Sequence, residues 1–431
     1  WPDGSTLDLH ADPEASASAI RAWGGPRAES DFRRFDARTR AAFDAFRAPV
    51  MEAPRIHPAA VATAALRAPA LWPMLAPGMT LARWLATQFR DPRLRQLFGR
   101  FATYTGGTPT RAPAILSLIW QAEAAGVWVV AGGMHRLAQT LATLAQQGGA
   151  TFRYTTTAER ILEHWGRVSG VALSDGSTLP ADEVIFNGDP AALRAGFLGR
   201  AVRDAVPAAG TTPRSLSARV WSFAATPRGA DLLHHNVFFC ADPRAEFAPL
   251  DRGEAPQDAS IYICAQDRGT GTPPTGPERF EIILNAPPLP PGTALDPKED
   301  DRCHALMLSQ LARRGLTFDP PPGPETMTGP DRFARMFPGS QGAIYGLSPH
   351  GMTASFRRPT AATALPGLWL AGGGAHPGAG VPMAARSGLH AAEAMLAARP
   401  STSRSTPTAM PGGMSTASRT MAPAPSRSSD S

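Results

Sequence analysis

The sequence predicts a mixed α/β fold with additional α+β elements, and three observations support this prediction. A strand–helix–strand pattern occupies residues 126–188, four β-rich runs recur between 215 and 285, and a strand, a glycine-rich loop and a helix follow one another from 367 to 397. Alternating helix and strand patterns are typical of α/β units, whereas consecutive strand patterns are typical of antiparallel sheets. The 431 residues are enough for two packed domains.

The composition narrows the classes of protein to which the chain can belong. Hydrophobic residues make up 43% and charged residues 18%, as in globular proteins, while 44 prolines and 41 glycines predict many turns. The cysteines, Cys240, Cys264 and Cys303, lie far apart without CxxC spacing, so we expect a reducing compartment, no disulfide framework and no zinc site. The net charge of +6 is shared with the C-terminal tail, so we expect no nucleic-acid partner.

The N-terminal residues predict a turn followed by a long helical stretch. The opening WPDGSTLDL indicates a hairpin turn at Asp3-Gly4 whose second strand is residues 5–9. Because two residues cannot supply the first strand of that hairpin, we expect the natural protein to begin further upstream. Residues 12–48 carry alanine, arginine and phenylalanine at helical spacings, with the arginines on a solvated face.

Residues 56–125 are helical in pattern and unusually apolar. They include two proline-punctuated amphipathic pieces that contain Trp72, Leu75, Trp84 and Leu85. Two interpretations stay open, because these side chains can pack as core or can form a hydrophobic lid or membrane-facing surface. The longest hydrophobic window, residues 112–134, is interrupted by polar residues and glycines, so we expect no membrane-spanning helix.

Residues 126–190 carry the most regular pattern of the chain. An apolar run at 127–131 predicts a strand, and leucines at helical spacing after Gly132-Gly133 predict a helix that ends at Gly148-Gly149. Further strands are predicted at 158–165, 168–174 and 182–187. Such a unit is typical of the accessory layer on a dinucleotide-binding sheet, whose opening βαβ unit is not in this sequence.

Residues 191–335 predict an antiparallel sheet and a helix. The β-rich runs are 216–224, 236–240, 260–265 and 280–285, and glycine- and proline-rich connections separate them. The helix begins with Asp296 as N-cap and Pro297 at its first position, and runs to about residue 314. Adjacent His234 and His235 are expected on opposite faces of a strand without a partner at metal-ligand spacing, so we predict no metal site.

The segment GGGAHPGAGVPMA at 372–384 follows a predicted buried strand and opens a helix at Pro382. Glycines let the backbone approach a flat ligand, and the free N–H groups of a helix N-terminus stabilise anionic or polarised oxygens. The spacing is not a GxGxxG fingerprint, so a simple tight turn stays the alternative. We expect His376, inside the loop, to order the backbone rather than to transfer a proton.

Three segments carry a family resemblance: FATYTGGTPTRAPAILSLIWQAEAAGVWVVAGGMHRL at 101–137, GSQGAIYGLSPHGMTASFRRP at 339–359 and GLWLAGGGAHPGAGVPMAARSG at 367–388. In this order and at similar spacing, they resemble the carotenoid desaturase family of FAD-dependent oxidoreductases. Phytoene-type desaturases usually read G-x-G-T-H-P-G-A-G-x-P-G, whereas this chain has Ala375 at the threonine and Met383 at the last glycine. These substitutions resemble the hydroxycarotenoid 3,4-desaturases, also called methoxyneurosporene dehydrogenases.

The resemblance implies FAD as the cofactor and desaturation of an acyclic carotenoid as the reaction. It places the adenine near Ala158 and the isoalloxazine ring against Gly372, Gly373, Gly374, Gly380, Val381, Pro382 and Met383. It identifies no residue as a catalytic acid or base. The family's N-terminal GxGxxG is missing from this sequence, so we expect the fragment to bind FAD poorly and to be inactive.

The resemblance also implies a division of the chain into six parts. These are a partial start of the FAD and substrate domains (1–55), an apolar segment facing substrate or membrane (56–125), an accessory part of the FAD domain (126–190), an antiparallel-sheet substrate domain (191–335), a C-terminal FAD-binding part (336–398) and a tail predicted to be disordered (399–431).

Two other functions stay open beside desaturation of the 3,4 bond of a 1-hydroxy- or 1-methoxy-carotenoid. One is a phytoene-type desaturase or carotene isomerase of the same fold, and the other is a non-catalytic protein that binds an apolar ligand or a membrane. For the desaturase, we expect a carotenoid substrate and a cytoplasmic location, with peripheral association at the inner or photosynthetic membrane.

Overall fold

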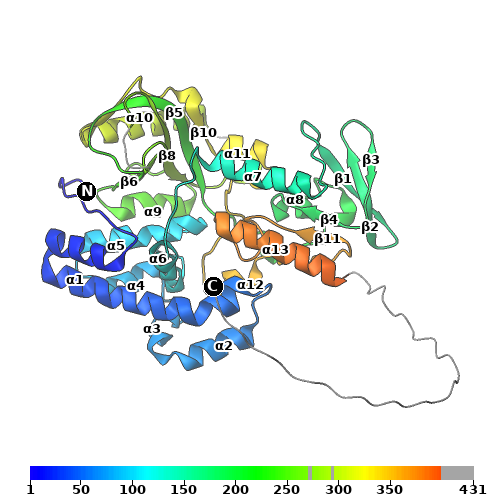
Figure 1. Cartoon of the computed structure of the whole chain (residues 1–431), viewed down its shortest axis with the longest axis horizontal. Helices are drawn as coiled ribbons and strands as arrows, with labels where there is room; N and C mark the ends of the chain where they lie inside the picture. Colours follow the sequence, from blue (N-terminus) through cyan, green and yellow to red (C-terminus); the bar gives the residue numbers. More distant parts are fainter. Residues whose placement is uncertain (270–273, 293–295, 399–431) are drawn as a thin grey trace, which may run out of the picture.

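A computed structural model describes residues 1–269, 274–292 and 296–398, so the predicted disordered tail at 399–431 lies outside the described residues. Figure 1 shows a helical layer of α1 to α6, a sheet flanked by α10, and a smaller unit with β1 to β4, β11 and α13. The helices are α1 (Pro13–Phe46), α2 (Pro58–Arg67), α3 (Trp72–Leu75), α4 (Leu81–Gln88), α5 (Pro92–Gly99), α6 (Ile119–Ala124), α7 (Met134–Gln147), α8 (Pro190–Ala195), α9 (Pro243–Arg252), α10 (Pro297–Arg313), α11 (Pro330–Met336), α12 (Ala354–Arg357) and α13 (Val381–Ala398). The strands are β1 (Ala158–His164), β2 (Arg167–Leu173), β3 (Thr178–Pro180), β4 (Val184–Phe186), β5 (Ser217–Gly229), β6 (His235–Phe238), β7 (Ile261–Ala265), β8 (Glu278–Ala286), β9 (Leu316–Asp319), β10 (Met327–Thr328) and β11 (Leu368–Leu370).

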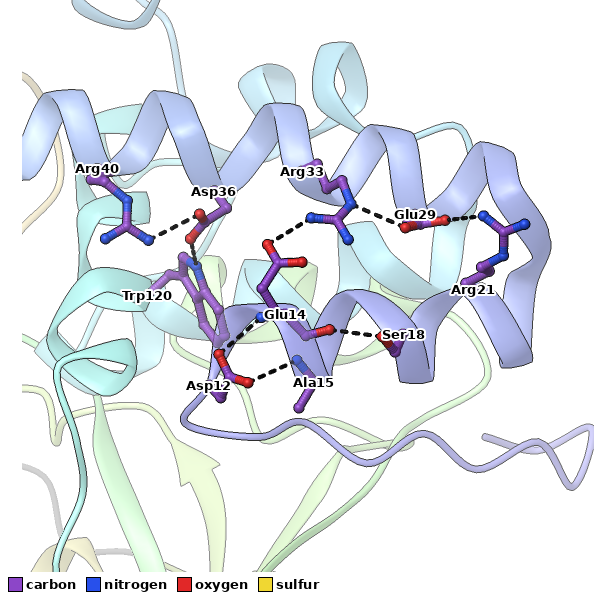
Figure 2. Close-up of polar contacts among 10 residues, drawn as sticks. All are labelled: Asp12, Glu14, Ala15, Ser18, Arg21, Glu29, Arg33, Asp36, Arg40 and Trp120. Carbon is purple, nitrogen blue, oxygen red and sulfur yellow. Dashed lines mark hydrogen bonds and ion pairs between the residues drawn. The ribbon is translucent and has the colours of Figure 1, made fainter.

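Helix α1 consists of two legs that meet at Gly25. This glycine has a φ of +82°, which lies outside the helical range and is favourable for glycine. Figure 2 shows the two legs side by side, with Arg33 of the second leg bound to Glu14 of the first at 2.7 Å and to Glu29 of its own leg at 3.0 Å. Arg33 and Arg40 keep exposed side chains, so the predicted solvated arginine face is confirmed for these two positions.

The predicted apolar helical segment supplies the core of the helical layer. Phe98 is buried, and its ring stacks on that of Phe89 with centroids 5.1 Å apart. Trp84 is 3% exposed and Leu85 is also buried, so the interpretation of these two residues as a lid or membrane-facing surface is wrong. Burial of such side chains stabilises the fold by about 1.5–3 kcal/mol each. Trp72 differs from them, since it is 53% exposed.

The antiparallel sheet predicted for residues 191–335 is confirmed. Its strands follow the order β10-β5-β8-β7-β6, and β9 pairs with the far end of β5. One face packs against α10 through a core that contains Trp221, Ile263 and Met307. Helix α10 begins as predicted, with the Asp296 carboxylate accepting the Lys298 N–H at 3.0 Å.

The smaller unit is organised around the parallel pair β4 and β11. Leu368 pairs with Val184, so the predicted buried strand before the glycine loop is present. The antiparallel strands β1, β2 and β3 form a separate sheet. A shared core that includes Ile161, Leu193 and Leu370 joins that sheet to α8 and β11, and places the glycine loop at the end of a packed strand.

Two predicted strands are absent from the described residues. Residues 5–9 form no strand, although Gly4 N–H closes the predicted turn by donating to the Trp1 carbonyl at 3.0 Å. Residues 127–131 also form no strand, and Trp128 is 81% exposed. An apolar run is compatible with a strand, but the strand forms only where a neighbouring strand accepts its hydrogen bonds.

Helix α7 forms as the leucine spacing predicts, but none of its residues is buried. Leu144, for example, is 57% exposed. No helix within residues 1–269, 274–292 and 296–398 combines the length and the hydrophobicity that a membrane crossing requires.

Candidate active site

The glycine loop at 372–380 is joined to the 339–359 segment by Arg358. The guanidinium donates to the carbonyl oxygens of Tyr345 at 3.1 Å and Gly373 at 2.9 Å. Burial lowers the pKa of Arg358 to about 10, with the Asp189 carboxylate acting in the opposite direction, so the side chain stays a cation at neutral pH. The backbones of the two segments also pack closely. A Cβ at Gly346 would lie only 3.1 Å from the Gly374 Cα.

The 101–137 segment also contacts the 339–359 segment. Thr108 N–H donates to His350 Nε2 at 2.9 Å, although these residues are 242 positions apart in the chain. Burial lowers the pKa of His350 to about 4, which keeps the ring neutral and able to accept this bond. A Cβ at Gly106 would lie 2.7 Å from the Tyr345 ring. The three segments that carry the family resemblance therefore meet in space.

The glycine loop has a packed beginning and an open end. Gly372 N–H donates to Ser387 Oγ at 2.7 Å, and a Cβ at Gly374 would lie 2.6 Å from Pro190. Gly380, at the start of α13, has a φ of +100° and no atom within 4 Å of its Cβ position. Val381, beside it, is exposed. The open end is a backbone surface against which a planar ring can lie.

The remaining predicted site residues fall into two groups. Gly373 is nearly open, since its Cβ position has only the Gly378 carbonyl oxygen at 4.0 Å, while Pro382 is exposed and Met383 is half-buried. These residues share one loop and helix start with Gly380. Ala158 lies elsewhere, as the exposed first residue of β1, and its sheet packs on the same core as β11.

His376 is turned into the protein. Its Nε2 lies 2.8 Å from the Ala53 carbonyl oxygen, and its ring stacks on that of His390 with centroids 6.0 Å apart. Because a carbonyl oxygen only accepts, Nε2 carries the proton and donates it. Burial lowers the pKa of His376, so the ring is held neutral. This contact is compatible with the predicted role of His376 in ordering the loop, which stays a prediction.

A group of polar side chains lies beside Tyr345, and we call it the polar cluster: Tyr104, Glu123, Tyr262, Glu281 and Tyr345. Tyr104 lies close to Glu123 in the helical layer. Tyr262 and Glu281 lie on the neighbouring strands β7 and β8, on the sheet face opposite the one that packs on α10. The cluster therefore joins the helical layer, the sheet and the segment that holds the glycine loop.

The side chains of the polar cluster are half-buried, except that of Tyr104, which is exposed. Burial raises the pKa of Glu123 and of Glu281, and the neighbouring side chains of Tyr104 and Gln266 only partly oppose this rise. Tyr104 is 41% exposed, yet burial raises its pKa as well.

Sequence reasoning missed the polar cluster. The chain contains four tyrosines, and three of them belong to the cluster. That count is the only signal in the sequence, because Tyr104, Tyr262 and Tyr345 come from three separate regions of the chain. Their common position follows only from the fold.

The two adjacent histidines are not placed as predicted. The rings of His234 and His235 lie 4.4 Å apart rather than on opposite faces, because His234 precedes β6 and does not follow the strand's alternation. Cys264 on β7 lies beside both rings. The expectation that the histidines lack a partner at metal-ligand spacing is therefore wrong.

Comparisons with known proteins give a consistent family assignment. The profile of the flavin containing amine oxidoreductase family matches residues 76–215. The hydroxyneurosporene desaturase of Cereibacter sphaeroides is 58% identical over 404 residues, which are 94% of this chain and 81% of that protein. The hydroxyneurosporene desaturases of Rhodobacter capsulatus and Rubrivivax gelatinosus are 52% and 42% identical over 93% and 96% of this chain, and over 80% and 79% of their own lengths.

Solved structures are more distant. An oxidoreductase from Methanosarcina mazei aligns with a TM-score of 0.48 at 16% identity, covering 76% of this chain and 71% of that chain. A variant of putrescine oxidase aligns with the same TM-score at 15% identity, over 86% of this chain and 76% of that chain. Structural similarity at this level does not indicate function.

Proposed function

Because the chain belongs to the carotenoid desaturase family of flavin-containing oxidoreductases, we propose that it introduces the 3,4 double bond into an acyclic carotenoid with a 1-hydroxy or 1-methoxy group. The three relatives described above are all named for hydroxyneurosporene, which favours this substrate over phytoene and favours desaturation over isomerisation. We further propose FAD as the flavin.

The single observation that supports a ring site at the loop is the open backbone at Gly380. A Cβ there would meet no protein atom within 4 Å, although the beginning of the same loop is closely packed. When bound, the flavin supplies a hydride acceptor for the CH₂ group beside the polyene. In this proposal the residues of the chain position the loop. Arg358 binds the Gly373 carbonyl, and His376 contacts the Ala53 carbonyl from the middle of the loop. The exposed N-terminus of α13 would then face the ring.

We propose that the polar cluster binds the oxygen of the substrate through a hydrogen bond. An oxygen on C1 is only two carbon atoms from C3, so a site that desaturates the 3,4 bond must also accommodate that oxygen. A buried ether or hydroxyl oxygen needs a hydrogen-bond donor. The Tyr104 hydroxyl of the polar cluster can donate to either a hydroxyl or a methoxy oxygen. A phytoene-type desaturase has no substrate oxygen to satisfy.

The ring site is tested with Gly380→Val in the full-length protein. A branched side chain there would occupy the open space, so we expect purified protein without flavin absorbance and without activity. Gly166→Val is the matched control, because Gly166 also has a positive φ of +73° and open space, but lies in the β1–β2 turn. His376→Ala should harm flavin content much less. Normal flavin content in Gly380→Val would contradict the proposed ring site.

The substrate is tested with Tyr104→Phe. We expect this variant to lower kcat/KM for 1-hydroxyneurosporene by about 10–100-fold, equivalent to 1–3 kcal/mol for a lost hydrogen bond, with flavin content retained. Tyr154→Phe is the control, because Tyr154 is exposed and lies outside the polar cluster. Equal losses with a carotene that lacks the oxygen would contradict recognition of that oxygen.

The two other functions are tested by product analysis. In a host that accumulates phytoene, formation of further double bonds would favour a phytoene-type desaturase. In a host that accumulates 1-hydroxyneurosporene, a new 3,4 double bond supports the proposal. Binding of carotenoid without any product in either host would favour a non-catalytic protein.

Peripheral membrane association remains a proposal, and Trp72 and Leu66 support it. Both side chains are exposed on neighbouring helices of the apolar segment. We expect the double variant Leu66→Ser/Trp72→Ser to bind liposomes more weakly with unchanged flavin content. Trp165→Ser is the control, since Trp165 is exposed in the distant β1–β2 turn. Unchanged liposome binding of the double variant would exclude this surface.

A further inference from the structure

At the edge of the antiparallel sheet, His234, His235 and Cys264 bring three metal-ligating side chains together. One ligand atom from each residue lies within 4.8 Å of the others. His235 and Cys264 are cross-strand partners in the β6–β7 pair, so their side chains share a face. We infer that these three residues form a zinc site, which nothing in the family's flavin chemistry requires.

The pair His234 and Cys264 already has the spacing of two ligands on one ion. His234 Nε2 lies 3.7 Å from Cys264 Sγ. Two ligands of a tetrahedral zinc ion at about 2.3 Å for sulfur and 2.0–2.1 Å for nitrogen lie about 3.6 Å apart. An ion therefore fits between these two atoms with little movement of either side chain.

Neighbouring groups orient both histidines for this role. His234 Nδ1 lies 2.6 Å from the Arg268 carbonyl oxygen. A carbonyl only accepts, so Nδ1 carries the proton and Nε2 keeps its lone pair on the side of Cys264. His235 Nδ1 lies 2.7 Å from the Tyr262 hydroxyl, which leaves His235 Nε2 for the ion. Such outer contacts are typical of zinc-binding histidines.

Several side-chain contacts hold Arg268, whose carbonyl oxygen orients His234. The Arg268 guanidinium forms two bonds to the Glu278 carboxylate, at 2.8 and 2.7 Å, and a third to the Leu232 carbonyl at 2.6 Å. Glu278 is buried. The Arg268 side chain is thus held by contacts that do not involve the histidines.

The donor set selects the class of ion. One thiolate and two imidazoles suit zinc and related borderline or soft ions, and do not suit calcium or magnesium, which prefer oxygen. Three protein ligands leave the fourth tetrahedral position for water. Bound zinc would join the start of the edge strand β6 to the end of β7. This inference does not rest on the proposed desaturase function.

The test measures zinc rather than activity. Untagged holoenzyme is stripped with a chelator, loaded with Zn²⁺ alone and gel-filtered, and its zinc content and affinity are measured by mass spectrometry and by competition with a chromophoric chelator. We expect about one retained Zn²⁺ per chain. Loss of the ligand in Cys264→Ser should weaken binding by more than the 10–100-fold that loss of an outer partner typically costs.

Matched variants separate the site from general effects. Cys303→Ser removes a buried thiol elsewhere, and His135→Gln removes an exposed histidine, so both should retain zinc as the unmodified protein does. Tyr262→Phe should weaken binding by about 10-fold through the orientation of His235. With Co²⁺, a thiolate charge-transfer band should appear in the difference spectrum and vanish in Cys264→Ser.

Two results would overturn the inference. The first is an unmodified protein that retains no zinc after gel filtration. The second is equal zinc affinity in the unmodified protein and in Cys264→Ser. If Cys264→Ser does not fold, as judged by circular dichroism and flavin content, the exposed His235→Gln replaces it, and unchanged zinc affinity in that variant overturns the inference.

Discussion

The helical layer and the stretch from 126 to 157 both carry regularly spaced apolar residues, but the fold uses them in opposite ways. In the helical layer, Phe98 and Trp84 are buried among other aromatic rings. In the second stretch, Trp128 and Leu144 are exposed, and helix α7 buries none of its residues. Helical periodicity predicted a helix in both regions. It did not predict whether another element covers the apolar face.

The physical reason is that burial depends on two surfaces. A helix with an apolar stripe is stabilised when a second element packs on that stripe. In the helical layer the two legs of α1 provide that surface, with Phe32 and Phe35 in contact with the rings of α4 and α5. The following predictions test how different the two regions are in solution, beginning with the largest expected effect.

Phe98→Ala should destabilise the protein by about 3–5 kcal/mol, because it leaves a cavity among Phe35, Phe89 and Trp120. Denaturant unfolding of the holoenzyme, followed by circular dichroism, measures this loss. A loss below about 1 kcal/mol would mean that the helical layer is no better packed than α7, and the comparison would fail.

His350 links the helical layer to the 339–359 segment, and this link should depend on pH. Burial lowers its pKa to about 4, with Arg111 adding to the effect and Asp251 opposing it. The folded-state pKa thus lies below the ordinary value of about 6.5, so the stabilisation is complete above pH 6.5 and is lost as the pH falls toward 4. Protonation of Nε2 would also break the bond from Thr108 N–H.

The expected size of this pH effect is about 2–3 kcal/mol between pH 7 and pH 4. His350→Gln should flatten the dependence of unfolding free energy on pH, while the exposed His135→Gln should leave the curve as it is. A curve in His350→Gln that is as steep as that of the unmodified protein would show that other groups carry the dependence.

Leu144→Ser should have the smallest effect. Its side chain is 57% exposed on α7, so we expect a change in unfolding free energy within about 0.5 kcal/mol. The same denaturant series measures it beside Phe98→Ala. A loss of 1 kcal/mol or more would show that the apolar face of α7 is covered in solution, which would remove the difference between the two regions.

Local sequence signals predicted several elements correctly. Asp296 and Pro297 predicted the start of α10 because a capping carboxylate and a first-turn proline act on the nearest few residues only. The β-rich runs predicted β5 to β8 because each has a neighbouring run with which to pair. The run at 127–131 predicted a strand by the same reasoning, and failed because no strand lies beside it within the described residues.

The candidate site was predictable only where its residues are adjacent in the chain. The glycine loop and the start of α13 follow from one continuous segment, and the family resemblance identified them. The polar cluster joins residues 104 to 345, and the proposed zinc ligands join two strands across 28 intervening residues between His235 and Cys264. Spacing along the chain says nothing about such groups, so the histidines were predicted to have no partner.

The sequence by itself therefore determined the local elements, the glycine loop and the family. The tertiary structure decided which apolar faces are buried, that Arg358 and His350 bring three distant segments together, and that Cys264 lies beside two histidines. The reason is the distance along the chain over which each effect acts. Capping, turn geometry and periodicity act within a few residues, whereas burial and side-chain clusters depend on which distant surfaces the packed chain places in contact.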